Sequence, residues 1–348
     1  MEKITKDCLK KYDLNDFLGM LKSFPSQIVN TVENDDFIND FIQPKSNIRK
    51  ILICGMGGSA VGGDLLNSLI SNKNYDKCPP IYVNRDYSVP GWVDSNTLVI
   101  FSSYSGNTEE VLKCFEKCKN KSVISFIITS GGKLLEIALQ YKIPYSLIPK
   151  DFMPRQALGF SITILLKFLN KINLIDQVLV DEVYESTKYL KEQADCFSDL
   201  NTSNESIEMA SRIYNKFNII YTSLKMEVVG SRFRAQLAEN AKILSTHFTF
   251  PEQNHNEIEA FENLHVNNFN IIWINDSAND LQISKRMNIT NELLNNIEHV
   301  KVSYNDFNYT TRILKLINLL DWVSYYASIM NKTNPYPVNT ITKLKKLL

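Results

Sequence analysis

The chain has 348 residues, of which 44% are hydrophobic and 22% charged, and its 38 basic and 38 acidic side chains leave no formal net charge. Such a balance argues against a nucleic-acid partner or an anionic membrane partner, which would need a basic excess. The charged first residues do not resemble a signal peptide, and no apolar run reaches the roughly 20 residues of a membrane span. Six scattered cysteines favour reduced thiols in a cytoplasmic protein over a disulfide framework or a metal site.

The first half of the chain has the pattern of an α/β fold. Residues 1–47 are predicted to form an N-terminal helical arm, and over 48–155 short apolar runs alternate with helical stretches. The runs predicted as strands cover 51–54, 81–83, 98–101, 124–129 and 146–148. Strands of this kind predict a parallel sheet with helices on both faces, and ligands bind at the carboxyl ends of its strands.

The second half repeats this organisation after a helical connector over 156–209. Apolar strands are predicted at 218–221 and 271–274 within a segment that covers 210–348. The helices predicted there are one from about Met226 to Leu244 with an apolar stripe of Val229, Phe233, Leu237 and Leu244, a long amphipathic one over 313–330, and a short terminal one over 338–348. The chain is therefore expected to contain two similar α/β halves.

Two loops after strands of the first half have the composition of phosphate-binding loops. Gly55–Ala60 is rich in glycine, and Ser102–Thr108 places four hydroxyl side chains around one glycine. Backbone N–H groups, hydroxyl donors and a helix N-terminus suit one phosphate group. The candidate phosphate-binding residues are Gly57, Gly58, Ser59, Ser103, Ser105 and Thr108. The alternative for either loop is an ordinary capped turn, which the occurrence of two such loops makes less favourable.

The first of these loops also fits the dinucleotide fingerprint G-x-G-x-x-A. That interpretation needs an acidic residue about 20 residues further on for the ribose; Asp86 lies somewhat far along the chain, and Arg85 beside it favours a 2′-phosphate. The dinucleotide interpretation leaves the second loop, Ser102–Thr108, unexplained. An NADP-dependent oxidoreductase is thus one alternative function.

Three positions are candidates for acid–base or electrostatic chemistry. Arg155 lies between a proline and a predicted helix, Glu239 lies off the apolar stripe of its helix, and His255 is one of only four histidines. Each has an ordinary structural explanation: a surface arginine, a solvated glutamate and a hydrogen-bonding loop histidine. Composition alone does not select any of them as catalytic.

The motifs of both halves resemble a known family. Gly55–Ser59, Ser103–Glu110 and Thr129–Lys133 look like the loops of the SIS (sugar isomerase) domain. Over nearly the whole chain the sequence is similar to the bifunctional phosphoglucose/phosphomannose isomerases, a branch with two SIS halves. The residues that carry this second resemblance are those around Arg155 and Glu239, Asn254–Ile258, Asp321–Tyr326, Pro337-Val338, Ile341 and Leu344-Lys345.

The resemblance implies a fold of two doubly wound, flavodoxin-like sheets, each an αβα sandwich. It also implies a reversible aldose–ketose isomerisation of glucose 6-phosphate and mannose 6-phosphate to fructose 6-phosphate through a cis-enediolate, without metal or organic cofactor. In this reaction Glu239 would move the proton between C1 and C2, and Arg155 would stabilise the enediolate oxygens. His255 would help to open the sugar ring, and Lys345 would assist it.

The family also implies a homodimer whose active site is completed across the interface, so that His255 can serve the partner's site. Two further alternatives to the isomerase remain open at this stage. One is a phosphosugar-sensing SIS module that binds without converting, and the other is an SIS isomerase for another sugar phosphate.

Overall fold

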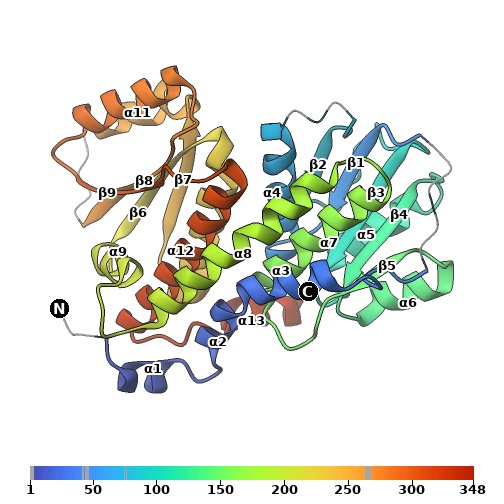
Figure 1. Ribbon diagram of the computed structural model, residues 1–348, viewed down its shortest axis with the longest axis horizontal. Coiled ribbons are helices and arrows are strands. Elements are labelled where there is room, and N and C mark those ends of the chain that lie inside the picture. Colours follow the sequence, from blue (N-terminus) through green and yellow to red (C-terminus); the bar gives the residue numbers. More distant parts are fainter. Residues whose placement is uncertain (1–3, 41–42, 44–46, 74, 76, 263–267) are drawn as a thin grey trace. The chain divides into compact units, whose positions relative to one another are not determined.

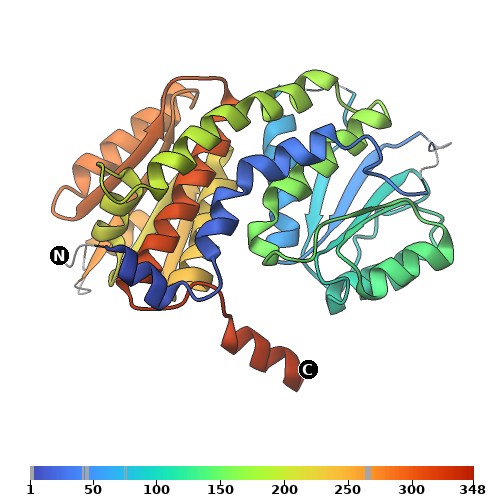
Figure 2. The same ribbon diagram turned by 60° about the horizontal axis from the view of Figure 1, so that its bottom comes forward.

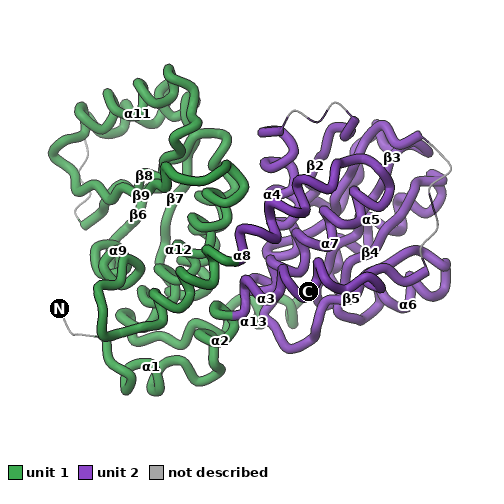
Figure 3. The backbone as a smooth tube through the Cα atoms, in the orientation of Figure 1, with its two compact units in different colours: residues 1–22, 188–348 green, residues 23–187 purple. Residues whose placement is uncertain are grey.

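The computed structural model describes residues 4–40, 43, 47–73, 75, 77–262 and 268–348. The chain forms two compact units, one of residues 23–187 and one of residues 1–22 together with 188–348 (Figure 3). Each unit contains one parallel sheet (Figure 1). The segment boundaries expected from the sequence stay a prediction.

The sheet of residues 23–187 has five parallel strands in the order β2-β1-β3-β4-β5. The strands are β1 (Lys50–Cys54), β2 (Ile81–Asn84), β3 (Thr97–Ser103), β4 (Ile124–Thr129) and β5 (Tyr145–Leu147). All five coincide with predicted strands to within two residues at either end. This order is that of the flavodoxin-like doubly wound fold, which confirms the expected fold class for the first half.

Helices cover both faces of this sheet, as the apolar strands require. On one face α5 (Glu109–Cys118) and α6 (Gly132–Tyr141) share a core with β1, β3 and β4. On the other, α4 (Gly58–Lys73) and α3 (Phe24–Glu33) both pack against α7 (Leu158–Lys171). Phe168 of α7 stacks on Phe126 of β4 with their ring centroids 3.8 Å apart.

The unit of residues 1–22 and 188–348 has a four-stranded parallel sheet in the order β7-β6-β8-β9. Its strands are β6 (Phe217–Ser223), β7 (Ser245–Phe250), β8 (Phe269–Asp276) and β9 (Glu298–Tyr304). The two central strands, β6 and β8, were predicted and the two edge strands were missed. An edge strand is only partly covered, and β9 buries only Val300 and Val302, so neither edge strand carries a continuous apolar run.

The long helix α12 (Tyr309–Met330) was predicted to be amphipathic, which is wrong: every residue except Lys315 and Met330 is buried. The helix predicted as far as Leu244 ends earlier. It comprises α10 (Glu227–Gln236) and one π-helical turn (Leu237–Ala241), after which Lys242 has a left-handed backbone. Leu244 is 75% exposed and does not belong to the apolar stripe.

The remaining helices complete the two units. They are α1 (Lys6–Tyr12), α2 (Phe17–Lys22), α8 (Gln177–Ser198), α9 (Glu205–Ile213), α11 (Leu281–Leu293) and α13 (Asn339–Leu347). The terminal helix α13, which ends at the C-terminus in Figure 2, was predicted. None of its residues is buried. Among the described residues, no helix combines the length and the apolar character needed to cross a membrane.

Candidate functional site

The two predicted phosphate loops meet at one serine. Ser59, in the first turn of α4, accepts a hydrogen bond on its Oγ from the backbone N–H of Tyr104 at 3.1 Å. Its carbonyl oxygen accepts another from the Ser102 hydroxyl at 3.0 Å. The loop after β1 and the loop after β3 therefore lie against each other at the carboxyl edge of the first sheet, where a doubly wound fold binds its ligand.

The second loop is not an ordinary capped turn. Thr108 occupies the N-cap position of α5, but within the described chain its side chain makes no capping hydrogen bond. Its hydroxyl instead shares a hydrogen bond of 2.7 Å with the hydroxyl of Ser103. Ser105 is exposed and accepts from the N–H of Asn107 at 3.2 Å. The Thr108 side chain therefore does not cap the first N–H groups of α5, and uncapped N–H groups at a helix N-terminus are suited to an external anion such as phosphate.

Two glycines give the first loop a turn conformation and a close backbone contact that a side chain would hinder. Gly57 is exposed and has φ +49°, a conformation that side chains rarely adopt. A Cβ at Gly58 would lie 2.8 Å from the backbone nitrogen and Cα of Arg155. The first turn of α4 and the Arg155 backbone are consequently in direct contact.

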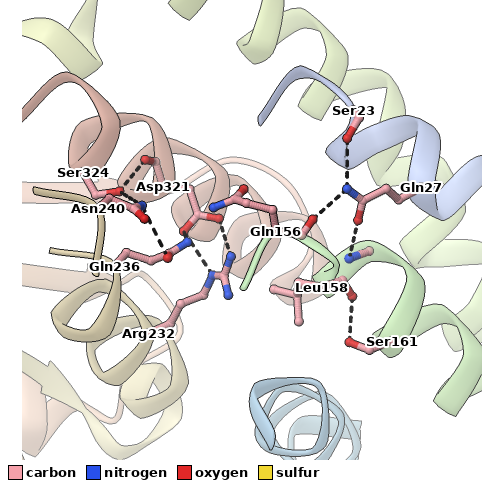
Figure 4. Close-up of polar contacts among 11 residues, drawn as sticks. Ser23, Gln27, Gln156, Leu158, Ser161, Arg232, Gln236, Asn240, Asp321 and Ser324 are labelled. Atoms are coloured by element: carbon pink, nitrogen blue, oxygen red, sulfur yellow. Dashed lines mark hydrogen bonds and ion pairs between the residues drawn. The ribbon is translucent and has the colours of Figure 1, made fainter. Parts of the chain in front are cut away.

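Arg155 is buried and lies in the 3₁₀ turn η1 (Pro154–Gln156). Gln27 of α3 fixes the residues that follow: its Nε2 donates to the carbonyl of Gln156 at 2.8 Å, and its Oε1 accepts from the N–H of Gly159 at 3.1 Å (Figure 4). The unit of residues 23–187 thus holds a permanent cation whose backbone contacts the first candidate phosphate loop. Sequence reasoning missed Gln27, although an amide within the apolar stripe of a helix is a usable signal for such a support.

The residues that would favour a dinucleotide do not form a free site. Arg85, which would face a 2′-phosphate, forms an ion pair with Asp64 of α4. Asp86 uses its carboxylate locally, accepting from the N–H of Tyr87 at 2.6 Å and from the Ser88 hydroxyl at 2.7 Å. These hydrogen bonds lower the pKa of Asp86.

Glu239 lies in the π-helical turn at the end of α10, and it is half-buried. This turn is anchored on both sides to α12. Arg232 makes two contacts with Asp321, at 3.0 and 2.6 Å, and Asn240 donates to the hydroxyl of Ser324 at 2.9 Å (Figure 4). A π-helical turn with fixed flanking residues is a frequent feature of functional sites. The position of Glu239 off the apolar stripe agrees with the prediction, since Leu237 is fully buried.

Sequence reasoning did not assign a role to Asp321, although it interrupts an apolar helix. Such a residue is a signal, because a carboxylate is found in the interior only when it is paired. Besides Arg232, the amide of Gln236 donates to Asp321 Oδ1 at 2.9 Å. Asp321 therefore supports the segment that carries Glu239.

His255 ends the 3₁₀ turn η4 (Glu252–His255) and is exposed. Two other histidines belong to the described part of the chain, and both are half-buried. Burial lowers the pKa of His247 to about 4 and also lowers that of His299. Burial thus disfavours the charged form of both rings, and His255 differs from them in being exposed.

One chain does not bring Glu239 and His255 together. Glu239 precedes the amino end of β7, and His255 follows its carboxyl end. The strand has six residues, and at about 3.3 Å per residue its ends are roughly 20 Å apart. The two side chains therefore lie at opposite edges of the second sheet.

The remaining candidate, Lys345, lies on α13 and is exposed, as are Lys343 and Lys346. The structure places the phosphate loops and Arg155 in one unit and Glu239, His255 and Lys345 in the other. Within the described residues, no cluster of three or more histidines, cysteines, aspartates and glutamates is arranged to hold a metal ion.

Comparison with known proteins adds to this geometry. Residues 202–348 match the model of the bacterial phospho-glucose isomerase C-terminal SIS domain. The chain is 36% identical to the bifunctional phosphoglucose/phosphomannose isomerase of Caldicellulosiruptor bescii, covering 94% of this chain and 97% of that one. It is 33% identical to the D-glucosamine-6-phosphate 4-epimerase of Sulfolobus acidocaldarius, over 68% of this chain and 71% of that protein.

Solved structures support the fold. The C-terminal domain of glucosamine-fructose-6-phosphate aminotransferase from Francisella tularensis superimposes with a TM-score of 0.69 at 15% identity, covering 91% of this chain and 97% of that one. At this identity the likeness concerns the fold alone.

Proposed function

The chain belongs to the family of bifunctional phosphoglucose/phosphomannose isomerases, and from this premise we propose that it interconverts glucose 6-phosphate, mannose 6-phosphate and fructose 6-phosphate. The observation that carries the proposal is the convergence of two hydroxyl-bearing loops on Ser59, beside the buried Arg155. These loops offer an oxyanion several donors and two helix N-termini, which suits the phosphate group of a sugar phosphate.

The residue types fit the chemistry of an aldose–ketose isomerisation. A single carboxylate, Glu239, takes the proton from one of the carbons C1 and C2 and returns it to the other. Arg155 stabilises the negative charge that develops on the enediolate oxygens, and it remains charged at any physiological pH. His255 exchanges protons with the ring oxygen during ring opening, and Lys345 assists it. The isomerisation oxidises one carbon of the sugar and reduces its neighbour, with no electrons passed to or from another molecule, so no cofactor is assigned.

We also propose that the enzyme is a homodimer in which His255 completes the site of the partner subunit. The separation of Glu239 and His255 by the length of β7 supports this arrangement. For the location we propose the cytoplasm, because the six cysteines are all free thiols.

A complementation experiment tests both parts of the proposal. Glu239→Gln and His255→Asn are each expected to lose about 10²-fold or more in kcat, since general acid–base catalysis contributes about that much. Mixing the two variants under subunit exchange should restore activity, because one of the two sites in a mixed dimer keeps both native residues. The assay follows glucose 6-phosphate and mannose 6-phosphate formed from fructose 6-phosphate. A fully active Glu239→Gln variant would refute the isomerase, and a mixture that stays inactive would refute the shared site.

A second candidate function is the conversion of an aminosugar phosphate, which the 33% identity to the glucosamine-6-phosphate epimerase favours. The same loops would bind its phosphate group. Incubation with glucosamine 6-phosphate and analysis of the product by NMR discriminates the two. If neither sugar phosphate is converted while fructose 6-phosphate still raises the melting temperature, the protein is a binding module.

A further inference from the structure

One hydroxyl group of the second sheet is hydrogen-bonded to both flanks of the turn that carries His255. Tyr221 of the central strand β6 is fully buried. Its hydroxyl donates to Oε1 of Glu257 at 3.0 Å and accepts from Nε2 of Gln253 at 3.2 Å. Glu257 lies two residues after His255 and Gln253 two residues before it, so both sides of the histidine converge on one oxygen atom.

The hydrogen bonds around this oxygen form a series in which each side chain donates to the next. Asn254 donates to Oε1 of Gln253 at 2.8 Å and to the hydroxyl of Thr290 in α11 at 2.9 Å. The donors thus proceed from Asn254 through Gln253 and Tyr221 to the carboxyl of Glu257. A connected chain of this kind polarises its members and fixes their orientation.

The carboxyl group of Glu257, at the end of this series of hydrogen bonds, is partly buried at a cost in free energy. Glu257 Oε2 is buried without a hydrogen-bond partner in the described residues. Burial raises the pKa of Glu257 to about 7, against the opposing effect of the Tyr221 hydroxyl. A surface turn needs no such costly carboxyl for stability, and one is retained here beside an exposed histidine.

We propose that Tyr221 is a positioning residue for His255, which fixes both flanks of the histidine turn and so sets the direction of the imidazole ring. The inference rests on the proposed isomerase function and deepens it. It assigns a role in the ring-opening step to a residue that is buried and does not reach the substrate.

Tyr221→Phe tests the proposal with little disturbance of the core. The phenyl ring retains the contacts with Phe250 and Trp273, whose ring centroids lie 5.7 and 5.2 Å away. We expect kcat to fall about tenfold with KM within about twofold, because small misplacements of a catalytic group reduce the rate steeply. In a His255→Asn background the same substitution should produce no further loss, since the two residues then act as one unit.

The chain contains a matched control. Tyr304 accepts from Nε2 of Gln193 at 2.8 Å and donates to Glu205 at 3.1 Å, the same arrangement of side chains with no histidine in it. Tyr304→Phe should leave kcat within about twofold of the wild type. Glu257→Leu, which removes the acceptor from the other end, should reproduce the loss seen in Tyr221→Phe.

Three results would overturn the proposal: unchanged kcat in Tyr221→Phe, an equal loss in Tyr304→Phe, or an equal loss in the His255→Asn background. A readout that does not depend on activity separates this failure from that of the proposed function. In NMR spectra of the histidine ring protons, with the His255 signal assigned by its absence in His255→Asn, Tyr221→Phe should shift or broaden that signal alone. A wild-type protein that converts no sugar phosphate refutes the function, and an unmoved His255 signal refutes the positioning role.

Discussion

At the same topological position, one sheet is followed by hydrogen-bond donors and the other ends in a carboxylate. In the first sheet β1 lies between β2 and β3, and in the second β6 lies between β7 and β8, so the carboxyl end of β8 corresponds to that of β3. After β3 come serine and threonine hydroxyls. At the end of β8, Asp276 forms a buried ion pair with Arg312 at 2.7 Å and accepts from the N–H of Ala278, also at 2.7 Å.

The second sheet therefore supplies its own anion at the point where we propose that the first sheet binds a phosphate group. The Asp276 carboxylate occupies the loop N–H and the arginine that would otherwise attract a phosphate group. One fold thus gives the proposed binding edge in one half and a structural ion pair in the other. The difference shows that function resides in the loops after the strands and not in the sheet itself.

The largest expected effect comes from breaking the ion pair of the second sheet. Asp276→Ala leaves Arg312 buried without its partner, and we expect a loss of about 3–5 kcal/mol in the free energy of unfolding. Urea denaturation followed by the fluorescence of Trp273 and Trp322 measures it. The control is Asp64→Ala, which breaks the more exposed pair with Arg85 and should cost less than about 1 kcal/mol. Equal losses would show that the buried and the more exposed ion pair contribute equally to the free energy of unfolding.

An intermediate effect is expected from the loop after β3. Ser105 is exposed, so Ser105→Ala should leave the melting temperature unchanged. It should raise KM for fructose 6-phosphate about tenfold, the loss expected for one hydrogen bond to a charged group. Isothermal titration with the same sugar phosphate checks that binding is affected. Unchanged affinity would remove Ser105 from the phosphate site.

The smallest effect concerns pH. The candidate phosphate loops offer hydroxyl and N–H groups that do not titrate near pH 7. The unit of residues 1–22 and 188–348 contains Glu257, whose pKa burial raises from 4.5 to about 7. An acid with a raised pKa binds its proton more tightly in the folded state, so stability falls as pH rises from about 4.5 to about 7. Glu257→Gln should therefore gain stability relative to the wild type at pH 8 but not below pH 5.

Melting temperatures of the two proteins at both pH values test this, with an expected difference of about 2 °C at pH 8. The exposed Glu259 of the same segment provides the control, because Glu259→Gln should show no such pH dependence. A Glu257→Gln difference that is the same at both pH values would contradict the raised pKa.

The sequence predicted the first sheet well and the second only in part, for a physical reason. The strands of the first sheet, such as β3, are buried along their length and read as continuous apolar runs. In β7 and β9 buried residues are interspersed with exposed polar ones. These strands therefore have no continuous apolar run, and their composition is like that of a loop. The helix at 313–330 was placed correctly, but its burial on all sides depends on neighbours distant in the sequence, including α9 and α10.

The candidate site was predictable where its residues are neighbours in the sequence. The composition of the loops pointed to Ser59, Ser103 and Thr108, and the structure brings these loops together. Arg155, Glu239 and His255 became candidates for catalysis only through the family resemblance, because their composition and position alone did not distinguish them from ordinary surface residues. The supports Gln27 and Asp321 were not assigned, although each interrupts the apolar pattern of a helix, because the residue that each one supports is known only from the structure. Tyr221 gave no such signal, since a tyrosine in an apolar strand is an ordinary core residue.

The contact between Gly58 and Arg155 limits how this protein can change. Any side chain at position 58 would collide with the Arg155 backbone, so stepwise mutation cannot add a residue there without displacing the cation. A library that varies the first phosphate loop alone should return glycine at this position. Changing the substrate by directed evolution would instead require exchanging the loop and the η1 turn together, for instance by recombining the whole segment from residue 55 to residue 156 with that of a relative.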